Sequence, residues 1–239
     1  MVQLRIYRCC MNKLIQKIKS IPWWGWVSGF FYFGLQYGMY RLGELLSRVL
    51  GTTAWAFECK IPFIDDLIPI IPVFAVFYLY SYIFWICGPI AVSLTKKRNF
   101  INYLYGLTLA YFIGFLFFVF MPTYMNRTKE GLMAAVAQPG LFTRILGVIY
   151  GADGGDLAFN LFPSYHCLIS LYCWLGVKDQ PEISKGYQRY SLAMVICICM
   201  STVFTKQHYI IDVFGGLLIA WGCWKFMAKL DPGRKHEGN

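Results

Sequence analysis

Six long apolar runs, separated by short polar segments, set the strongest constraint on how this chain folds. A transmembrane helix needs about 20 consecutive residues that are mostly apolar, so repeated runs of this kind indicate membrane spans. The runs cover residues 23–40, 68–94, 100–121, 162–177, 192–204 and 209–227, and the fourth is short. We therefore expect an all-α polytopic membrane protein with six transmembrane helices.

The composition supports a chain that lies in a bilayer rather than in water. Charged residues make up only 14% of the 239 residues, whereas a soluble domain carries roughly 25%. The net charge is +10, but no basic stripe lies outside the short loops, so no nucleic-acid partner is expected. The nine cysteines include no CxxC pair, which argues against a zinc site.

The basic residues are distributed unevenly between the predicted loops. If the N-terminus is cytoplasmic, the inner segments 1–20, 95–99, 178–190 and 225–239 hold 15 of the 22 basic residues but only four of the 12 acidic residues. This bias fits the positive-inside rule with an even number of spans, so both termini are predicted to be cytoplasmic.

The apolar runs and the charges together divide the chain into three parts. Residues 1–20 are predicted to form a basic amphipathic segment. Residues 21–228 form the six-helix membrane domain, with the motif core at 100–220, and residues 229–239 form a cytoplasmic tail.

Two predicted outer segments are long enough to have structure of their own. Residues 41–50 alternate leucines with Arg41, Glu44 and Arg48, as in an amphipathic helix that lies on the outer interface. Residues 122–161 contain several glycines between apolar residues, and a loop of this length usually has a function. We therefore expect an interfacial helix at 41–50 and a functional loop at 122–161.

Two histidines, His166 and His208, fall at the outer ends of predicted spans. Asp212 follows His208 by four residues, so the two side chains share a helix face. A carboxylate there accepts the ring N–H, which fixes the tautomer and leaves the other nitrogen free to attack. A structural Asp–His pair at a helix end explains His208 and Asp212 equally well. The second histidine at the same depth favours a catalytic site.

Three further side chains near this depth are candidates for binding an anion. Ser164 stands where it can cap the helix that carries His166, and free N–H groups at a helix start attract anions. Arg127, at the outer end of the third span, offers a planar fork to phosphate oxygens, and Lys206 is a second cation. The alternatives are an ordinary helix start for Ser164 and contacts with lipid headgroups for Arg127 and Lys206.

At these residues the sequence resembles a known family. Residues 163–166, Pro-Ser-Tyr-His, resemble the Pro-Ser-x-His motif of the type 2 phosphatidic acid phosphatase superfamily. Residues 201–212 resemble its Ser-x6-His-x3-Asp motif, and residues 122–127, which begin Pro-Thr and end in Arg, resemble its first motif. The resemblance spans about residues 100–220.

The resemblance implies a six-helix membrane enzyme that forms a phosphohistidine at the outer membrane face without a metal. It implies no cofactor. In these roles His208 is the nucleophile, Asp212 orients it, and His166 protonates the leaving group. The implied phosphate-binding residues are Arg127 and Ser164, with Lys206 as a helper.

The sequence departs from the family pattern at four positions. Thr202 stands where the third motif has an Arg, and Tyr165 stands where Gly is common. Phe120 replaces the first-motif Lys, and Thr128 replaces the Pro after Arg127. This set is similar to the branch that includes inositol phosphorylceramide and sphingomyelin synthases, in which an alcohol rather than water resolves the phosphohistidine.

The function expected from the resemblance is hydrolysis of a lipid phosphate, such as phosphatidic acid or a polyprenyl diphosphate. The substrate would be a membrane lipid, and the membrane a bacterial plasma membrane. Three alternatives remain open: a lipid phosphotransferase, a bis-histidine haem carrier, and a degenerate scaffold without activity. The sequence gives no prediction of the oligomeric state.

Overall fold

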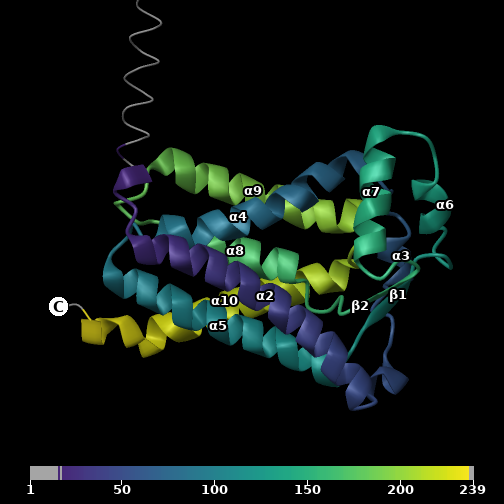
Figure 1. The fold of residues 1–239 in the computed structure, drawn as a ribbon, viewed down its shortest axis with the longest axis horizontal. Helices are drawn as coiled ribbons and strands as arrows, with labels where there is room; N and C mark the ends of the chain where they lie inside the picture. The colour runs from purple at the N-terminus through teal and green to yellow at the C-terminus, as the bar shows by residue number, and fades with distance from the viewer. Residues whose placement is uncertain (1–15, 17, 237–239) are drawn as a thin grey trace, which may run out of the picture.

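The computed structural model describes residue 16 and residues 18–236, which form an almost wholly helical molecule (Figure 1). Among these residues, four helical segments are long and apolar enough to cross a membrane. They are α4 (Ala75–Val92) with the preceding 3₁₀ turn η2 (Pro72–Phe74), α5 (Lys97–Phe120), α9 (Lys185–Phe204) and α10 (Ile210–Leu230). They correspond to the second, third, fifth and sixth apolar runs.

The other two predicted spans are α2 (Trp23–Val49) and α8 (Tyr165–Val177). α2 is long enough to cross a bilayer, but its Trp, Tyr and Gly residues keep its hydropathy below that of the four candidate spans. α8 has 13 residues, whereas a helix that crosses the membrane alone needs about 20. Length and composition thus support four membrane spans, and six spans stay a prediction.

The helix predicted separately at residues 41–50 is the last part of α2, which corrects the expected boundary. Arg41 and Arg48 lie three residues before and four residues after Glu44, and both form ion pairs with it. Charged pairs at these spacings stabilise a continuous helix. The predicted amphipathic segment 1–20 lies outside the described residues except at residue 16 and residues 18–20.

α8 forms the centre of the helical bundle. It packs against α4, α5, α9 and α10, and most of its side chains are buried. Its tyrosines and leucines join the main hydrophobic core together with aromatic residues of α4 and α5. A short helix enclosed by four others in this way places its first residues, which include His166, inside the molecule.

One end of the bundle carries a small cap, which lies at the right of Figure 1. The cap contains an antiparallel pair of short strands, β1 (Tyr124–Asn126) and β2 (Leu157–Phe159), with Met125 opposite Ala158. Between the strands lie α6 (Leu132–Val136) and α7 (Leu141–Ala152). The segment predicted as a loop at 122–161 is therefore folded, and it shares a hydrophobic cluster with Ala75 and Tyr78 of α4 and with Tyr209.

The chain also enters the cap between α2 and α4, through the 3₁₀ turn η1 (Thr52–Trp55) and α3 (Pro62–Asp65). The opposite end of the bundle holds the start of α2 and the end of α10 (Figure 1). There α10 is followed by the 3₁₀ helix η3 (Pro232–His236), which contacts α5. The predicted tail from residue 229 therefore begins in the last turn of α10.

Candidate active site

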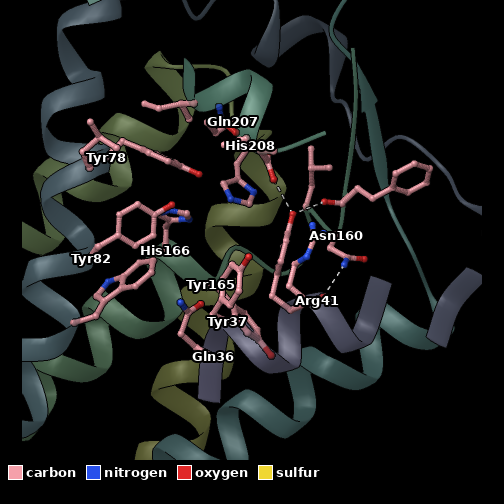
Figure 2. Close-up of a pocket in the computed structure, with 18 of the residues that line it drawn as sticks. Gln36, Tyr37, Arg41, Tyr78, Tyr82, Asn160, Tyr165, His166, Gln207 and His208 are labelled. Atoms are coloured by element: carbon pink, nitrogen blue, oxygen red, sulfur yellow. Dashed lines mark hydrogen bonds between the residues drawn. The ribbon is translucent and has the colours of Figure 1, made fainter. Parts of the chain in front are cut away.

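A cavity of about 320 Å³ lies where the bundle meets the cap. Its walls come from α2, α4, α5, α7 and α8 and from the turn before α10, and most of its lining side chains are aromatic or aliphatic. His166 and His208 both line this cavity (Figure 2), although 42 residues separate them in the sequence. The structure thus brings the two predicted histidines to one site.

The two imidazole rings face each other across a short gap. Their centroids lie 5.9 Å apart, and the ring planes are inclined by 59°. His166 stacks on Tyr78 at 4.1 Å and touches Trp85 edge to face at 4.8 Å, so aromatic rings fix its orientation. Its Nε2 is buried and has no hydrogen-bond partner.

A tight turn between α9 and α10 positions His208. The backbone N–H groups of Gln207 and His208 both donate to the carbonyl oxygen of Thr202, at 2.9 and 3.1 Å. Lys206 makes the turn possible with a φ of +50°, a left-handed conformation that few residues other than glycine adopt. Thr202, which replaces the family Arg, therefore holds the histidine turn through its backbone.

Asp212 is completely buried one turn after His208. Its Oδ2 accepts a hydrogen bond from the backbone N–H of Tyr209 at 2.9 Å and lies 3.4 Å from His208 Nδ1. That second distance is slightly longer than a hydrogen bond, and Nδ1 has no other partner. The carboxylate is therefore close enough to accept a hydrogen bond from the Nδ1–H group with a small adjustment of the distance.

Ser164 connects the start of α8, which carries His166, with the start of α10, which follows the His208 turn. Its hydroxyl caps α8 by accepting from the backbone N–H of Cys167 at 3.4 Å, and its own N–H donates to the carbonyl oxygen of Asp212 at 3.0 Å. Gly216 of α10 packs so closely here that an added Cβ would lie 2.4 Å from the Ser164 carbonyl oxygen. Ser164 is fully buried and lies behind the cavity wall.

Arg127 lies next to the cavity but does not line it, and protein groups occupy its terminal nitrogens. One of these nitrogens donates to the carbonyl oxygens of Tyr150, Asp153 and Gly155 at 2.9 to 3.3 Å. The other donates to the Asp153 carboxylate at 2.7 Å and to the Gln207 side chain at 2.9 Å. Arg127 thus ties the cap to the histidine turn, and phosphate binding by it stays a prediction.

Lys206 points away from the cavity. Its Nζ donates to the carbonyl oxygen of Asp65 at 2.7 Å, in the segment that leads from α3 to α4. Burial lowers the pKa of Lys206 from its usual value, and the nearby Lys60 ammonium acts in the same direction. The structure therefore does not bring Lys206 together with the two histidines.

A comparison of the sequence with known families identifies the chain. The sequence profile of the PAP2 superfamily matches residues 56–226, which include both histidines, Asp212, Ser164 and Arg127. The chain belongs to the PAP2 superfamily. The resemblance found in the motifs is confirmed at this level, and the synthase-like branch stays a prediction.

One curated relative is an uncharacterized protein of Methanocaldococcus jannaschii, which is 26% identical over 160 residues. The alignment covers 66% of this chain and 61% of the relative, so the chain spans less than two thirds of the length of the protein it matches. No solved structure gives a significant match. The PAP2 match begins after α2, although α2 contributes one wall of the cavity.

Several polar residues of this PAP2 cavity were not predicted from the sequence: Gln207, Asn160, Asp153 and Arg41. Gln207 Nε2 and Asn160 Oδ1 are buried without a hydrogen-bond partner, which is unusual for polar atoms unless a ligand or water binds there. The only feature of the sequence that could have predicted Gln207 as a cavity residue is its position next to His208. Asn160 lies in the segment predicted as a functional loop, and Arg41 lies in the segment predicted as a helix on the outer membrane interface.

Within the described residues, no three His, Cys, Asp or Glu side chains are grouped as metal ligands. The chemistry available at the site is that of two imidazoles and one buried carboxylate, with amide groups and one arginine around them. In a PAP2 protein these groups are suited to acid–base and nucleophilic steps on a phosphate.

Proposed function

We propose that the protein is an integral-membrane lipid phosphatase that works through a phosphohistidine intermediate. The single observation that carries this proposal is the pair of imidazoles, 5.9 Å apart in one cavity, with the Asp212 carboxylate 3.4 Å behind one of them. Membership of the PAP2 superfamily supports phosphatase-like chemistry. The proposed substrates are phosphomonoester or diphosphate lipids, such as phosphatidic acid or a polyprenyl diphosphate.

In the first step His208 Nε2 attacks phosphorus, and the P–O bond to the lipid breaks. The separation of the two rings suits this step, because a nucleophile in position to attack lies about 3–3.5 Å from the reacting atom. His166 donates its proton to the leaving oxygen, and Asp212 stabilises the positive charge that develops on His208.

In the second step water attacks phosphorus and the P–N bond breaks. His166, which has lost its proton, accepts one from the water and returns to its starting state. The roles of acid and base alternate on one side chain, as microscopic reversibility requires. Inorganic phosphate leaves. The lipid alcohol remains in the bilayer when the substrate is a phosphomonoester, and the lipid monophosphate remains when it is a diphosphate.

The direct test is His208→Ala in purified protein, with phosphate release measured on phosphatidic acid and on a polyprenyl diphosphate. We expect the variant to fold and to lose turnover. Brief incubation of the wild-type protein with ³²P-labelled substrate, followed by alkaline quenching, is expected to trap acid-labile label at His208. Turnover by the variant at the wild-type rate would disprove the role of His208 as the nucleophile.

A second candidate function is transfer of the phosphoryl group or headgroup to an alcohol. The specific observation that favours it is the cavity wall, which is largely aromatic and offers Gln207 and Asn160 to hold a hydroxyl. A site that excludes water in this way protects the phosphohistidine until an alcohol arrives. Product analysis with candidate alcohols separates the two functions, because transfer gives a new phosphate ester in place of inorganic phosphate.

A further inference from the structure

The cavity has a deep end and an exposed mouth. At the deep end His208 is 9% exposed and Gln207 is 2% exposed. At the mouth, Tyr37 of α2, Leu79 of α4 and Val148 of α7 line the same cavity with exposures of 60%, 43% and 73%. The mouth therefore opens between three helices on the side of the bundle.

The surface next to this mouth is strongly apolar. On α2 and α4 the exposed side chains include Phe30, Phe31, Val76 and Ile83. In a bilayer such a surface contacts acyl chains, because its apolar side chains are then shielded from water. A molecule that reaches the histidines through this mouth passes along hydrocarbon first.

Among the described residues that line the cavity, Arg41 is the only lysine or arginine. It lies on the α2 wall (Figure 2), and its side chain is 57% exposed. Arg127 does not supply a second free charge, because its guanidinium is paired with the Asp153 carboxylate at 2.7 Å. Arg41 is thus the permanently charged cation at the cavity that can attract an anion.

Arg41 is available for a new partner. Its ion pair with Glu44, at 3.2 Å, is exposed, and exposed pairs contribute little to stability. The other carboxylate oxygen of Glu44 accepts from Arg48 at 2.7 Å. Glu44 therefore stays paired when Arg41 turns toward an anionic ligand.

From these contacts we propose that Arg41 binds the phosphate headgroup of a lipid that enters through the side mouth between α2, α4 and α7. The acyl or prenyl chains stay on the exposed apolar surface of α2 and α4 while the headgroup reaches the histidines. This proposal rests on the proposed function for the fate of the headgroup. It assigns substrate selection to α2, which lies outside the PAP2 match at residues 56–226.

The test measures binding in a His208→Ala background, so that no turnover intervenes. A fluorescent short-chain phosphatidic acid is displaced from the detergent-solubilised protein by dioctanoyl phosphatidic acid, by dioctanoylglycerol or by glycerol 3-phosphate. Arg41→Gln is compared with Arg48→Gln, a matched control that removes an equally exposed arginine bound to the same Glu44 but outside the cavity.

Arg41→Gln is expected to weaken binding of dioctanoyl phosphatidic acid about tenfold, which is the loss of one charge-assisted hydrogen bond. Arg48→Gln is expected to leave binding unchanged, and neither substitution affects dioctanoylglycerol. Equal weakening by both substitutions, or none by Arg41→Gln, would overturn the role of Arg41. If glycerol 3-phosphate binds as tightly as dioctanoyl phosphatidic acid, the acyl chains contribute nothing to binding. That result would overturn the proposal that the ligand enters as a lipid.

The outcome is independent of the proposed chemistry. If the wild-type protein releases no phosphate from any lipid but Arg41→Gln still weakens lipid binding selectively, the phosphatase proposal fails and the headgroup site stands. If phosphate release depends on His208 but binding does not depend on Arg41, the headgroup site fails and the phosphatase proposal stands.

Discussion

At the scale of single residues, the ionisable side chains that face the cavity differ from those that hold the cap to the bundle. His166 and His208 face the cavity, whereas Arg127 is fully buried and bonded to the cap and to Gln207. A guanidinium with a carboxylate beside it contributes little net charge to the cavity. The prediction from the sequence recognised the position of Arg127 but not its partners.

We therefore expect Arg127→Met to lower the stability of the protein by about 3 kcal/mol, the usual cost of removing one partner of a buried pair. Asp153 would be left without its guanidinium. In the double variant with Asp153→Asn, part of this loss should return, giving a coupling energy of about 1–2 kcal/mol. Thermal unfolding in detergent measures all three variants, and strictly additive losses would contradict the pairing.

Asp212→Asn tests the carboxylate beside His208, the proposed nucleophile. An asparagine oxygen still accepts from the Tyr209 N–H, so the start of α10 is kept, but the carboxylate near His208 Nδ1 is lost. Loss of the residue that orients and stabilises a catalytic histidine lowers turnover about 10²–10⁴-fold. We expect phosphate release to fall by that factor with unchanged unfolding temperature, and unaltered turnover would argue against the orienting role.

The sequence allowed part of this site to be predicted. The four-residue spacing predicted that His208 and Asp212 lie close together, and the two side chains are 3.4 Å apart. The prediction that they share a helix face is wrong for His208, which lies in the turn before α10 (Ile210–Leu230). Two partners of Arg127, Asp153 and Gly155, lie in a turn where Gly154 and Gly155 have φ values of +88° and +64°. Such a turn is formed by tertiary contacts, and no periodicity in the sequence predicts which carbonyl oxygens it presents.

At the scale of helices, the contact between α8 and α10 sets the distance between the two histidines. The Ser164 N–H bonds to the Asp212 carbonyl oxygen, and Gly216 leaves no room for a Cβ against Ser164. Periodic apolar runs predicted both helices. They did not predict that α2 continues to Val49, because the charges at 41–48 pair along the helix instead of ending it.

Gly216→Ala should therefore separate α10 from the start of α8. The added methyl group would meet a backbone oxygen at 2.4 Å, and overpacking of this kind costs about 1–3 kcal/mol. Gly222→Ala is the matched control in the same helix, since nothing lies within 4 Å of its added Cβ. We expect loss of stability and turnover only in Gly216→Ala, and equal behaviour of the two variants would contradict the close contact.

At the opposite end of the bundle, Arg98 and Asn102 of α5 contact Asp231 at the end of α10. The contribution of this contact to stability depends on pH. Hydrogen bonds from Arg98 and Asn102 hold the pKa of Asp231 below its usual value. A lowered pKa stabilises the folded state above the unfolded pKa of about 3.9, and the contribution is lost as the pH falls through the folded pKa.

Asp231→Asn keeps the left-handed backbone at residue 231, which asparagine tolerates. The variant is expected to unfold at a lower temperature than the wild type at pH 7, with the difference shrinking below about pH 4. Circular dichroism melts at the two pH values measure this, and a difference that grows in acid would show that the carboxylate does not stabilise this end.

At the scale of the whole molecule, the cap occupies one end of the bundle, and the start of α2 and the end of α10 occupy the other (Figure 1). The cavity lies where the bundle meets the cap. The charge bias of the loops predicts that the second end is cytoplasmic. The cap itself was predicted only as a long segment, because its two short strands and α7 are stabilised by packing against the bundle rather than by their own sequence.

This arrangement predicts the results of fusions at the C-terminus and in the cap. Green fluorescent protein fused after residue 239 should fluoresce, because it folds in the cytoplasm. Alkaline phosphatase fused at the same place should be inactive, because it needs the oxidising outer side to form its disulfides. Alkaline phosphatase inserted at the exposed turn near Gly140 should be active. The reverse pattern would invert the proposed orientation.

The position of α2 outside the family match has a consequence for how such proteins diverge. The histidines and the α2 wall of the cavity lie on separate stretches of chain. If α2 selects the substrate as proposed, changes in residues 36–41 alter which lipids bind while the histidines stay constant. A chimera that carries the first helix of another member would then inherit that member's lipid preference together with the unchanged catalysis of its host.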